Sequence, residues 1–514
     1  MKFNHRTPTG RVDLDASTGP RPPTPGSGRT LFVASAATLL VLIDFTTIFA
    51  TLQDTASELE ASTPSQTWAL SAMSLGLAAA LLTAGAIADT FGRRRVLRAG
   101  VVGLAVSSAV VGAAPTIEVL VIGRVFQGVG GAAILAAALG LIGNAFPSGS
   151  SRTRATGIWG AMLGAGVMIG PLVGASLAAI GDWRTAYWFE AVLAVTLGVA
   201  IGRIPESLST IRRPVDLAGA TVLSTSMVAM TAGFVYARTS WTSGPTIGFL
   251  IAGTTLLIVF AAVETRGSDP MLNLGLLRDP DFAASVIGAT VTGLSTIALL
   301  SYLPSFLQRA MNLSVFASAT VLAAWSGTST ILAWHARRLP TRIDARLRLM
   351  TGFAISAAGL ASLSGLSASS GWMRLLPGLL VTGIGTGLVN AALGGLAVSS
   401  VPAGDAAMGS GANLTARYLG GGAGIALVIS IATANAETDP TAGLIRGWNI
   451  AAVVAAATCA TGAALIAGLT KRVRRLDKRS RTNHHNPSTD QRTTGHRRPP
   501  GNSTAFDERA HGGQ

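Results

Sequence analysis

The chain is poor in cysteine, in charge and in aromatic side chains. Its 514 residues include one cysteine, Cys459, which excludes a disulfide framework and a cysteine-based zinc or iron–sulfur site. Charged residues form 12% of the chain, against roughly 25% in soluble domains, so most of the sequence has no water-facing surface to cover. The histidines lie mainly in the terminal segments, away from the apolar sequence. We therefore expect no enzyme activity, no metal site and no cofactor.

Apolar residues dominate instead, at 49% of the chain with a mean hydropathy of +0.49, which is typical of a polytopic membrane protein. A helix needs about 20 apolar residues to cross the hydrocarbon core, and about fourteen segments meet this length. They cover residues 31–53, 66–88, 96–114, 118–145, 155–180, 185–204, 217–237, 245–263, 282–308, 315–334, 347–367, 372–399, 410–434 and 448–470. We predict an all-α membrane protein whose polar segments 1–30 and 471–514 are disordered tails.

Arginine is distributed unequally between the two sets of loops. Loops after the even-numbered segments hold most of the arginines, including Arg93, Arg94 and Arg95. Those on the other side hold only Arg184, Arg238, Arg309, Arg374 and Arg446. Basic residues mark the cytoplasmic side, so both tails are expected in the cytoplasm of a cell bounded by this plasma membrane. The basic tail has no aromatic interleaving for nucleic acid, and attraction to anionic membrane lipids explains its charge more simply.

The loop GAIADTFGRRRVL, which joins the second and third segments, places Asp89 at the carboxyl end of a helix. The helix dipole disfavours an anion there, so an arginine or another helix's amino terminus should satisfy it. Such a pairing would make a breakable cytoplasmic latch. The arginines alone also have a simpler interpretation as determinants of membrane topology.

Four segments resemble signatures of the major facilitator superfamily, in chain order and on the expected helices. The loop matches at Gly85, Asp89, Gly92, Arg93 and Arg94. IGRVFQGVGGA resembles the arginine-containing segment of the fourth helix, matched at Arg124, Gln127 and Gly128. GVMIGPLVGA is similar to the signature associated with antiporters, through Gly166, Gly170, Pro171 and Gly174. RYLGGGAGIAL, which begins at Arg417, looks like the penultimate-helix segment of the fourteen-helix drug:proton antiporter branch.

The resemblance implies a major facilitator fold, with two six-helix bundles at 31–204 and 282–470 around a central cavity. Residues 205–281 would be a linker region that carries an extra pair of transmembrane helices. Rocking of the bundles would then give alternating access to the two sides. Gly166, Gly170 and Gly174 recur every fourth residue, so they share one helical face and permit close helix packing. With Pro171 as a kink, this face is interpreted either as ordinary packing or as a pivot between bundles.

Charges within the apolar segments are the strongest functional signal. Asp44 lies about 20 Å from the cytoplasmic face, and Arg124 about 21 Å, at about 1.5 Å per helical residue. Burial and a nearby arginine act in opposite directions on a carboxyl group, so Asp44 is a candidate for gaining and losing a proton. The resemblance assigns proton coupling to Asp44 and Arg124. The alternatives are a structural hydrogen bond for Asp44 and an Arg124 side chain that reaches the outer interface.

Glu190 stands where the relatives commonly have asparagine, at about the depth of Asp44. It either faces the cavity, where it would join proton coupling or favour cationic substrates, or lies at the outer interface and pairs with Arg184. Other departures are Phe49 and Gln53, where asparagine and proline are usual, and the absence of the loop glycines from 337–348. These departures weaken inference of a particular substrate.

The pattern favours a proton-driven antiporter that exports amphipathic drugs, antibiotics or secondary metabolites. Its expected partners are a small amphipathic substrate, protons and membrane lipids, and no nucleic acid. A proton-coupled importer on the same fold and a non-transporting sensor or scaffold are the alternatives.

Overall fold

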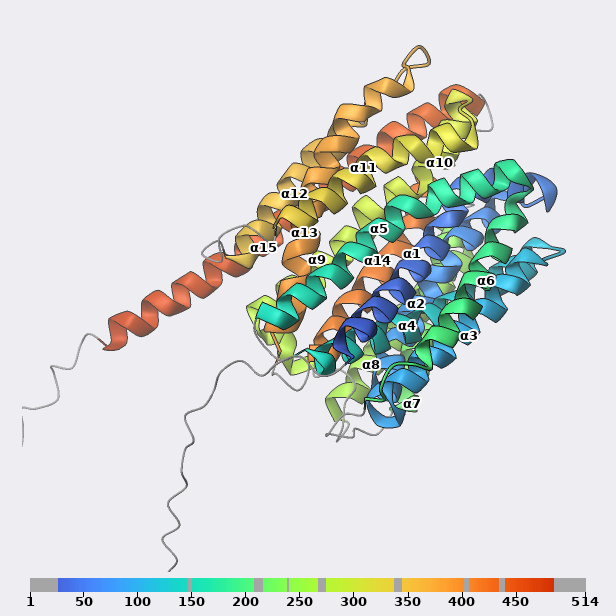
Figure 1. Cartoon of the computed structure of the whole chain (residues 1–514). Coiled ribbons are helices and arrows are strands. Elements are labelled where there is room, and N and C mark those ends of the chain that lie inside the picture. Colours follow the sequence, from blue (N-terminus) through green and yellow to red (C-terminus); the bar gives the residue numbers. More distant parts are fainter. Residues whose placement is uncertain are drawn as a thin grey trace, which may run out of the picture. The chain divides into compact units, whose positions relative to one another are not determined.

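The computed structural model describes residues 26–146, 150–207, 216–237, 240–266, 274–336, 344–401, 406–433 and 440–484. In these residues all regular structure is helical (Figure 1). The first helices are α1 (Ser27–Glu58), α2 (Thr63–Phe91), α3 (Arg93–Gly112), α4 (Ile117–Ala145), α5 (Ser150–Ile180), α6 (Trp183–Ile201), α7 (Leu217–Ala237) and α8 (Gly244–Arg266). The others are η1 (Leu274–Arg278), α9 (Pro280–Thr292), η2 (Gly293–Ile297), α10 (Ala298–Met311), α11 (Val315–Ala336), α12 (Ala345–Ser362), η3 (Trp372–Leu375), α13 (Leu376–Ser399), α14 (Ala406–Thr433) and α15 (Pro440–His484).

The helices account for the expected membrane spans. Among the described residues, 13 helical stretches are long and apolar enough to cross a membrane. One of them, Pro280–Met311, combines α9, the π-helical turn η2 and α10. The expected segment 347–367 corresponds to α12, which is shorter and carries Arg346 and Arg348 in its first turn. With α12 counted, the prediction of about fourteen transmembrane helices is confirmed.

Local sequence signals set several helix starts. The Ser62 hydroxyl accepts a hydrogen bond from the Ser65 backbone N–H at the start of α2. Asp182 and Thr185 form a reciprocal capping box at the start of α6. Asp279 precedes α9, which begins with Pro280, and its side chain accepts from two backbone N–H groups in the first turn of that helix. These caps satisfy backbone donors that the first turn of a helix leaves unpaired.

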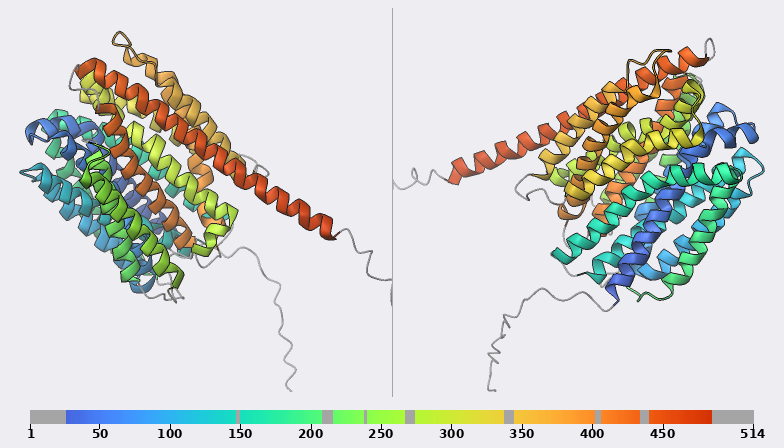
Figure 2. Two further views of the ribbon diagram at one scale, coloured as in Figure 1. Left: turned by 180° about the vertical axis from the view of Figure 1, so that it is seen from behind. Right: turned by 45° about the horizontal axis from the view of Figure 1, so that its top comes forward.

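The spans form two groups that lie side by side (Figure 2). In the first, α4 packs against α1, α2 and α3, while α5 packs on α1 and α6 on α3. In the second, α13 packs against α11 and α12, and α14 packs against α9 and η2. Contacts of α2 with α14, of α5 with α11 and of α1 with α10 join the groups. Two packed groups of helices agree with the two bundles that the sequence predicted.

The helix pair α7 and α8 pack on each other, and α7 also contacts α2 and α14. A cluster of buried apolar side chains holds the pair in place. It consists of Leu75, Leu82, Leu223, Met227 and Phe260. The pair therefore rests on helices from both groups, as expected for an insertion between them.

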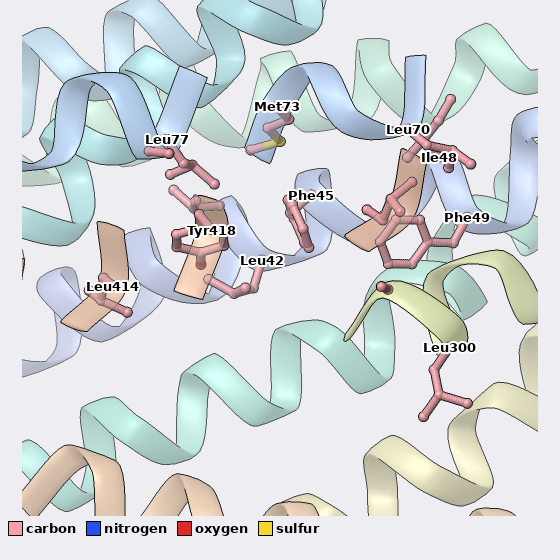
Figure 3. Packing of buried hydrophobic residues seen from close by; sticks show 14 of the residues in the cluster. Leu42, Phe45, Ile48, Phe49, Leu70, Met73, Leu77, Leu300, Leu414 and Tyr418 are labelled. Atoms are coloured by element: carbon pink, nitrogen blue, oxygen red, sulfur yellow. The ribbon is translucent and has the colours of Figure 1, made fainter. Parts of the chain in front are cut away.

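Apolar side chains fill the junction between the groups (Figure 3). Phe45 of α1 meets Tyr418 of α14 edge to face, with ring centroids 5.7 Å apart. Leu42, Phe49, Leu70, Met73, Leu77, Leu300 and Leu414 are buried in the same cluster. The junction thus combines α1, α2, α10 and α14.

The contact between α2 and α4 depends on two facing glycines. A Cβ atom at Gly128 would lie 2.3 Å from the main-chain oxygen of Met73, and one at Gly76 would lie 2.1 Å from that of Val125. A side chain at either position would therefore force the two helix backbones apart. Small residues of this kind let membrane helices approach closely, which favours their association.

We predict that Gly128→Ala lowers stability by about 1–3 kcal/mol, because the added methyl group overpacks this contact. Thermal unfolding of the purified protein in detergent measures the effect. Gly143→Ala, on the same helix with open space around its Cβ position, is the matched control and should not lower the melting temperature. Equal melting temperatures for the two variants would contradict the prediction.

Candidate functional site

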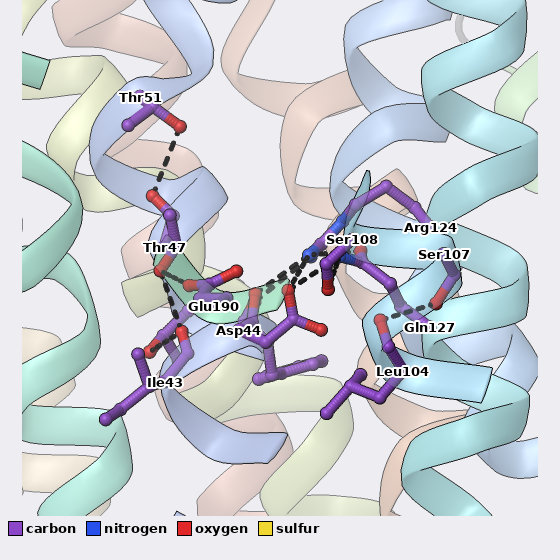
Figure 4. A network of polar contacts seen from close by, with 12 residues as sticks. Ile43, Asp44, Thr47, Thr51, Leu104, Ser107, Ser108, Arg124, Gln127 and Glu190 are labelled. Carbon is purple, nitrogen blue, oxygen red and sulfur yellow. Dashed lines mark hydrogen bonds and ion pairs between the residues drawn. The ribbon is translucent and has the colours of Figure 1, made fainter. Parts of the chain in front are cut away.

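Arg124, Asp44 and Gln127 form a polar cluster that is fully buried between α1 and α4 (Figure 4). The Arg124 guanidinium donates to the main-chain oxygens of Asp44 at 2.8 Å and Phe45 at 3.2 Å. Its Nη1 also lies 3.8 Å from Asp44 Oδ1. Gln127 donates to Asp44 Oδ1 at 2.7 Å and accepts from Arg124 at 3.1 Å. Both charges predicted to share one depth are therefore neighbours.

Glu190 of α6 extends the cluster from the other side of α1. Its side chain is 1% exposed and accepts a hydrogen bond of 2.6 Å from the Thr47 hydroxyl. Figure 4 shows its carboxyl group next to that of Asp44. Arg184, the alternative partner, instead pairs with Glu58. Two carboxyl groups and one guanidinium thus share a buried site.

One oxygen of each carboxyl group has no donor in the described part of the chain. These atoms are Asp44 Oδ2 and Glu190 Oε2. Ionised carboxylates only accept hydrogen bonds, so a proton bound to either group would supply the donor that these oxygens lack. Like charges in a shared buried site also disfavour simultaneous ionisation. The geometry therefore suits the binding and release of a single proton.

Thr47 and Ser108 were absent from the sequence-based set of site residues, and Gln127 was named only as part of the signature around Arg124. Gln127 follows Arg124 by three positions and Thr47 follows Asp44 by three, so helical spacing places each on the same face as its partner. Ser108 of α3 accepts a hydrogen bond from Gln127 at 3.0 Å, and no local pattern connects it with the cluster.

The glycine face of α5 packs against α1. A Cβ atom at Gly166 would lie 2.4 Å from Leu42 Cβ, and one at Gly170 would lie 2.1 Å from Thr46 Oγ1. At Gly174 the corresponding distance to Thr47 Cγ2 is 3.0 Å. This face joins two helices of the same group, and Pro171 follows Gly170 within α5. It supports the helix that bears Asp44.

Asp89 and Arg93 interact at the junction of α2 and α3. Arg93 donates from Nε and Nη2 to Asp89 Oδ1, at 3.0 and 2.8 Å. The same guanidinium donates to the main-chain oxygen of Gly140 in α4 at 3.0 Å. The sequence analysis expected either an arginine or the amino terminus of another helix as the partner of Asp89. In the structure an arginine compensates this carboxylate.

Glu206, which was not expected at the site, caps the start of α3. Its Oε1 accepts from the backbone N–H groups of Arg94 at 2.9 Å and Ser207 at 3.1 Å. Its Oε2 lies 3.7 Å from Arg94 Nε and 3.8 Å from Arg95 Nε. Gly92 has φ 110°, and a Cβ there would lie 2.9 Å from the Glu206 carboxyl. Glu206 therefore packs directly against the loop between α2 and α3. Because it is more than 100 residues away from this loop in the sequence, no local sequence pattern predicts the contact.

Arg417 lies on α14, apart from this cluster, and donates to Asn390 Oδ1 of α13 at 3.0 Å. Within the described residues, no group of three or more acidic, histidine or cysteine side chains is placed to hold a metal ion.

A helical membrane protein with two packed groups and ionisable residues buried between helices has the features of a secondary transporter. Comparison with known proteins identifies the family. The model of the Major Facilitator Superfamily matches residues 34–425. The chain belongs to this superfamily, so it is a multi-pass membrane transporter of small molecules and not an enzyme.

Individual relatives agree with this assignment. The chain is 29% identical to the puromycin resistance protein of Streptomyces alboniger, over 82% of this chain and 87% of that protein. It is 28% identical to the tetracenomycin C resistance and export protein of Streptomyces glaucescens, over 79% and 77% of the two chains. The crystal structure of the human organic anion transporter TETRAN shares the fold, with a TM-score of 0.62 and 16% identity, and the match covers 86% of this chain and all of that one.

We predict that Glu206→Ala costs about 1 kcal/mol of stability, because the backbone N–H of Arg94 at the start of α3 and that of Ser207 lose their acceptor. Glu206→Gln keeps an acceptor oxygen and should lose less. Thermal unfolding in detergent compares both with Glu60→Ala, which removes an exposed acid. A Glu206→Ala melting curve that overlays the Glu60→Ala curve would show that the cap contributes nothing.

Proposed function

We propose that the chain is a proton-driven antiporter that exports amphipathic compounds by alternating access. The observation that carries this proposal is the buried set of Asp44, Glu190 and Arg124. With both acids ionised, the set has a net charge of −1; with one proton bound, it is neutral. An uncompensated charge in the membrane interior is costly, so binding of a proton is favoured when the site faces an acidic compartment.

The contacts between the helix groups support a rocking mechanism. In this proposal 31–204 and 282–470 are the moving bundles and 205–281 is their linker region. The α5–α11 and α2–α14 contacts would open and close on alternate sides, while Gly166, Gly170, Pro171 and Gly174 keep α5 on α1. The set of Gly85, Asp89, Gly92, Arg93 and Arg94, with Glu206, would act as a conformational latch.

The names of the relatives favour export over import. One is described as a resistance protein and another as a resistance and export protein. Both names concern antibiotics, so amphipathic antibiotics, drugs or secondary metabolites are the proposed substrate class. Import on the same fold is the alternative, and the direction of pH-driven transport distinguishes the two.

Orientation follows from the arginine distribution. We propose that the α2–α3 end lies in the cytoplasm, that both termini lie on the same side, and that the membrane is the plasma membrane. Arginines at this end would also contact anionic lipid headgroups.

Asp44→Asn tests the coupling, because asparagine keeps the shape of the side chain but cannot take up or release the proton. In proteoliposomes with an imposed pH gradient, uphill transport of cationic and neutral amphiphiles should be lost, while exchange without a gradient continues.

Glu190→Gln should reduce export of the cationic probe more than that of the neutral probe and shift the pH dependence. Glu118→Gln removes an exposed acid from α4 and is the control. Full gradient-driven transport by Asp44→Asn would exclude this residue from coupling.

Single-cysteine labelling tests the orientation. Replacement of Cys459 by serine gives a cysteine-free background. In intact cells, an impermeant maleimide should label Ser369→Cys, in the exposed loop between α12 and α13, but not Ser480→Cys. Labelling of Ser480→Cys from outside would reverse the proposed topology.

A further inference from the structure

Arg417 is a further cation within the membrane-spanning region, and no acidic residue in the described part of the chain pairs with it. It forms none of the ion pairs found between described residues, whereas Arg124 is paired with Asp44. Its side chain is partly buried, and its hydrogen bond to Asn390 supplies a neutral acceptor. A cation in this environment is costly and is usually compensated. Arg417 is therefore poised for an anion that the described chain does not supply.

The surrounding helices keep Arg417 inside the protein. Its helix, α14, contacts α2, α7, α9, α10 and α13. A Cβ atom at Gly293, in the π-helical turn η2, would lie 2.1 Å from the Arg417 main-chain oxygen. The backbone of Arg417 is thus packed directly against η2. π-Helical turns of this kind frequently occur at functional sites.

Arg417 also lies at the junction of the two helix groups. Its neighbour Tyr418 packs edge to face on Phe45, which follows Asp44 in α1. The side chain of Asn390 contacts Arg417 from α13, a helix of the same group as α14. Arg417 is thus next in sequence to a residue that contacts the other helix group, so relative movement of the groups would change the surroundings of a ligand bound at Arg417.

The chemistry of the pair is that of a hydrogen-bond donor site. A guanidinium has five N–H donors and no acceptor, and its planar fork matches the two oxygens of a carboxylate or phosphate. The Asn390 oxygen is used by Arg417, which leaves the amide Nδ2 with its two donors for a ligand. Charge and donor geometry both favour an oxygen-bearing anion over a cation.

We propose that Arg417 and Asn390 form a subsite that binds the acidic group, a carboxylate or phosphate ester, of a transported amphipathic compound. This inference rests on the proposed transport function and adds a substrate class to it.

Three dansyl probes with the same fluorophore test the subsite by equilibrium titration of the purified protein in detergent. Dansylglycine carries a carboxylate, dansylglycinamide is neutral, and a dansyl quaternary ammonium compound is cationic. The wild-type protein should bind dansylglycine most tightly. Arg417→Gln should weaken dansylglycine binding by about tenfold or more, as expected for a lost charged hydrogen bond, and leave the cationic probe unaffected.

Asn390→Asp provides a second variant that keeps the arginine. The new carboxylate should pair with Arg417 and weaken dansylglycine binding in the same way. Arg417→Lys keeps the charge without the planar fork and should fall between wild type and Arg417→Gln. Arg309→Gln, which removes an exposed arginine at the end of α10, is the matched control and should bind all probes as wild type does.

Several outcomes would overturn the proposal. One is that the wild-type protein binds dansylglycine and dansylglycinamide with equal affinity. Another is that Arg417→Gln weakens the binding of all three probes equally. A third is that an equal concentration of phosphatidylglycerol displaces dansylglycine, which would assign the site to lipid. These titrations need no pH gradient. A protein that discriminates the probes but shows no pH-driven transport would contradict the antiporter proposal alone.

Discussion

Arg124 sets the central constraint on this molecule, because a guanidinium without water must find all its partners in the protein. Two main-chain oxygens of α1, the Gln127 amide and the Asp44 carboxylate provide them for Nη1 and Nη2, whereas Nε has no acceptor among the described residues. Leaving one member of a buried ion pair alone typically costs about 3–5 kcal/mol. The position of α4 against α1 is therefore fixed by charge as well as by packing. Hydrogen bonds from Gln127 to Ser108 and from Thr47 to Glu190 extend the constraint to α3 and α6.

Close helix packing makes this polar cluster possible. Arg124 reaches main-chain oxygens of α1 only because the neighbouring helices lie near one another. Gly128 brings α4 onto α2 one turn beyond Arg124, and Gly170 brings α5 onto α1 beside Thr46. In a membrane, apolar side chains gain little by leaving lipid for protein, so backbone proximity and hydrogen bonds contribute more of the association energy. The glycines thus bring the helices close together, and the polar side chains then form hydrogen bonds between them.

The sequence was sufficient to predict the spans and the shared depth of Asp44 and Arg124, because hydropathy and helical rise are local properties. Helix ends were less predictable: α1 begins at Ser27 and runs to Glu58, beyond the apolar segment 31–53. Glu206, Ser108 and Asn390 were not predicted, because their roles arise from contacts between distant segments. The π-helical turn η2 lies where Gly293 packs closely against α14, and the hydropathy pattern does not predict this turn.

The two proposed binding positions are adjacent to one aromatic contact. Asp44 precedes Phe45 in α1, Arg417 precedes Tyr418 in α14, and the two rings meet edge to face. Aromatic pairs of this geometry prefer particular orientations, so a rotation of either helix that accompanies a change of charge would alter the contact. A proton at Asp44 and Glu190 and an anion at Arg417 would then each bias the same junction. Such reciprocal bias is what coupling between two ligands requires, since each ligand must distinguish the same two conformations.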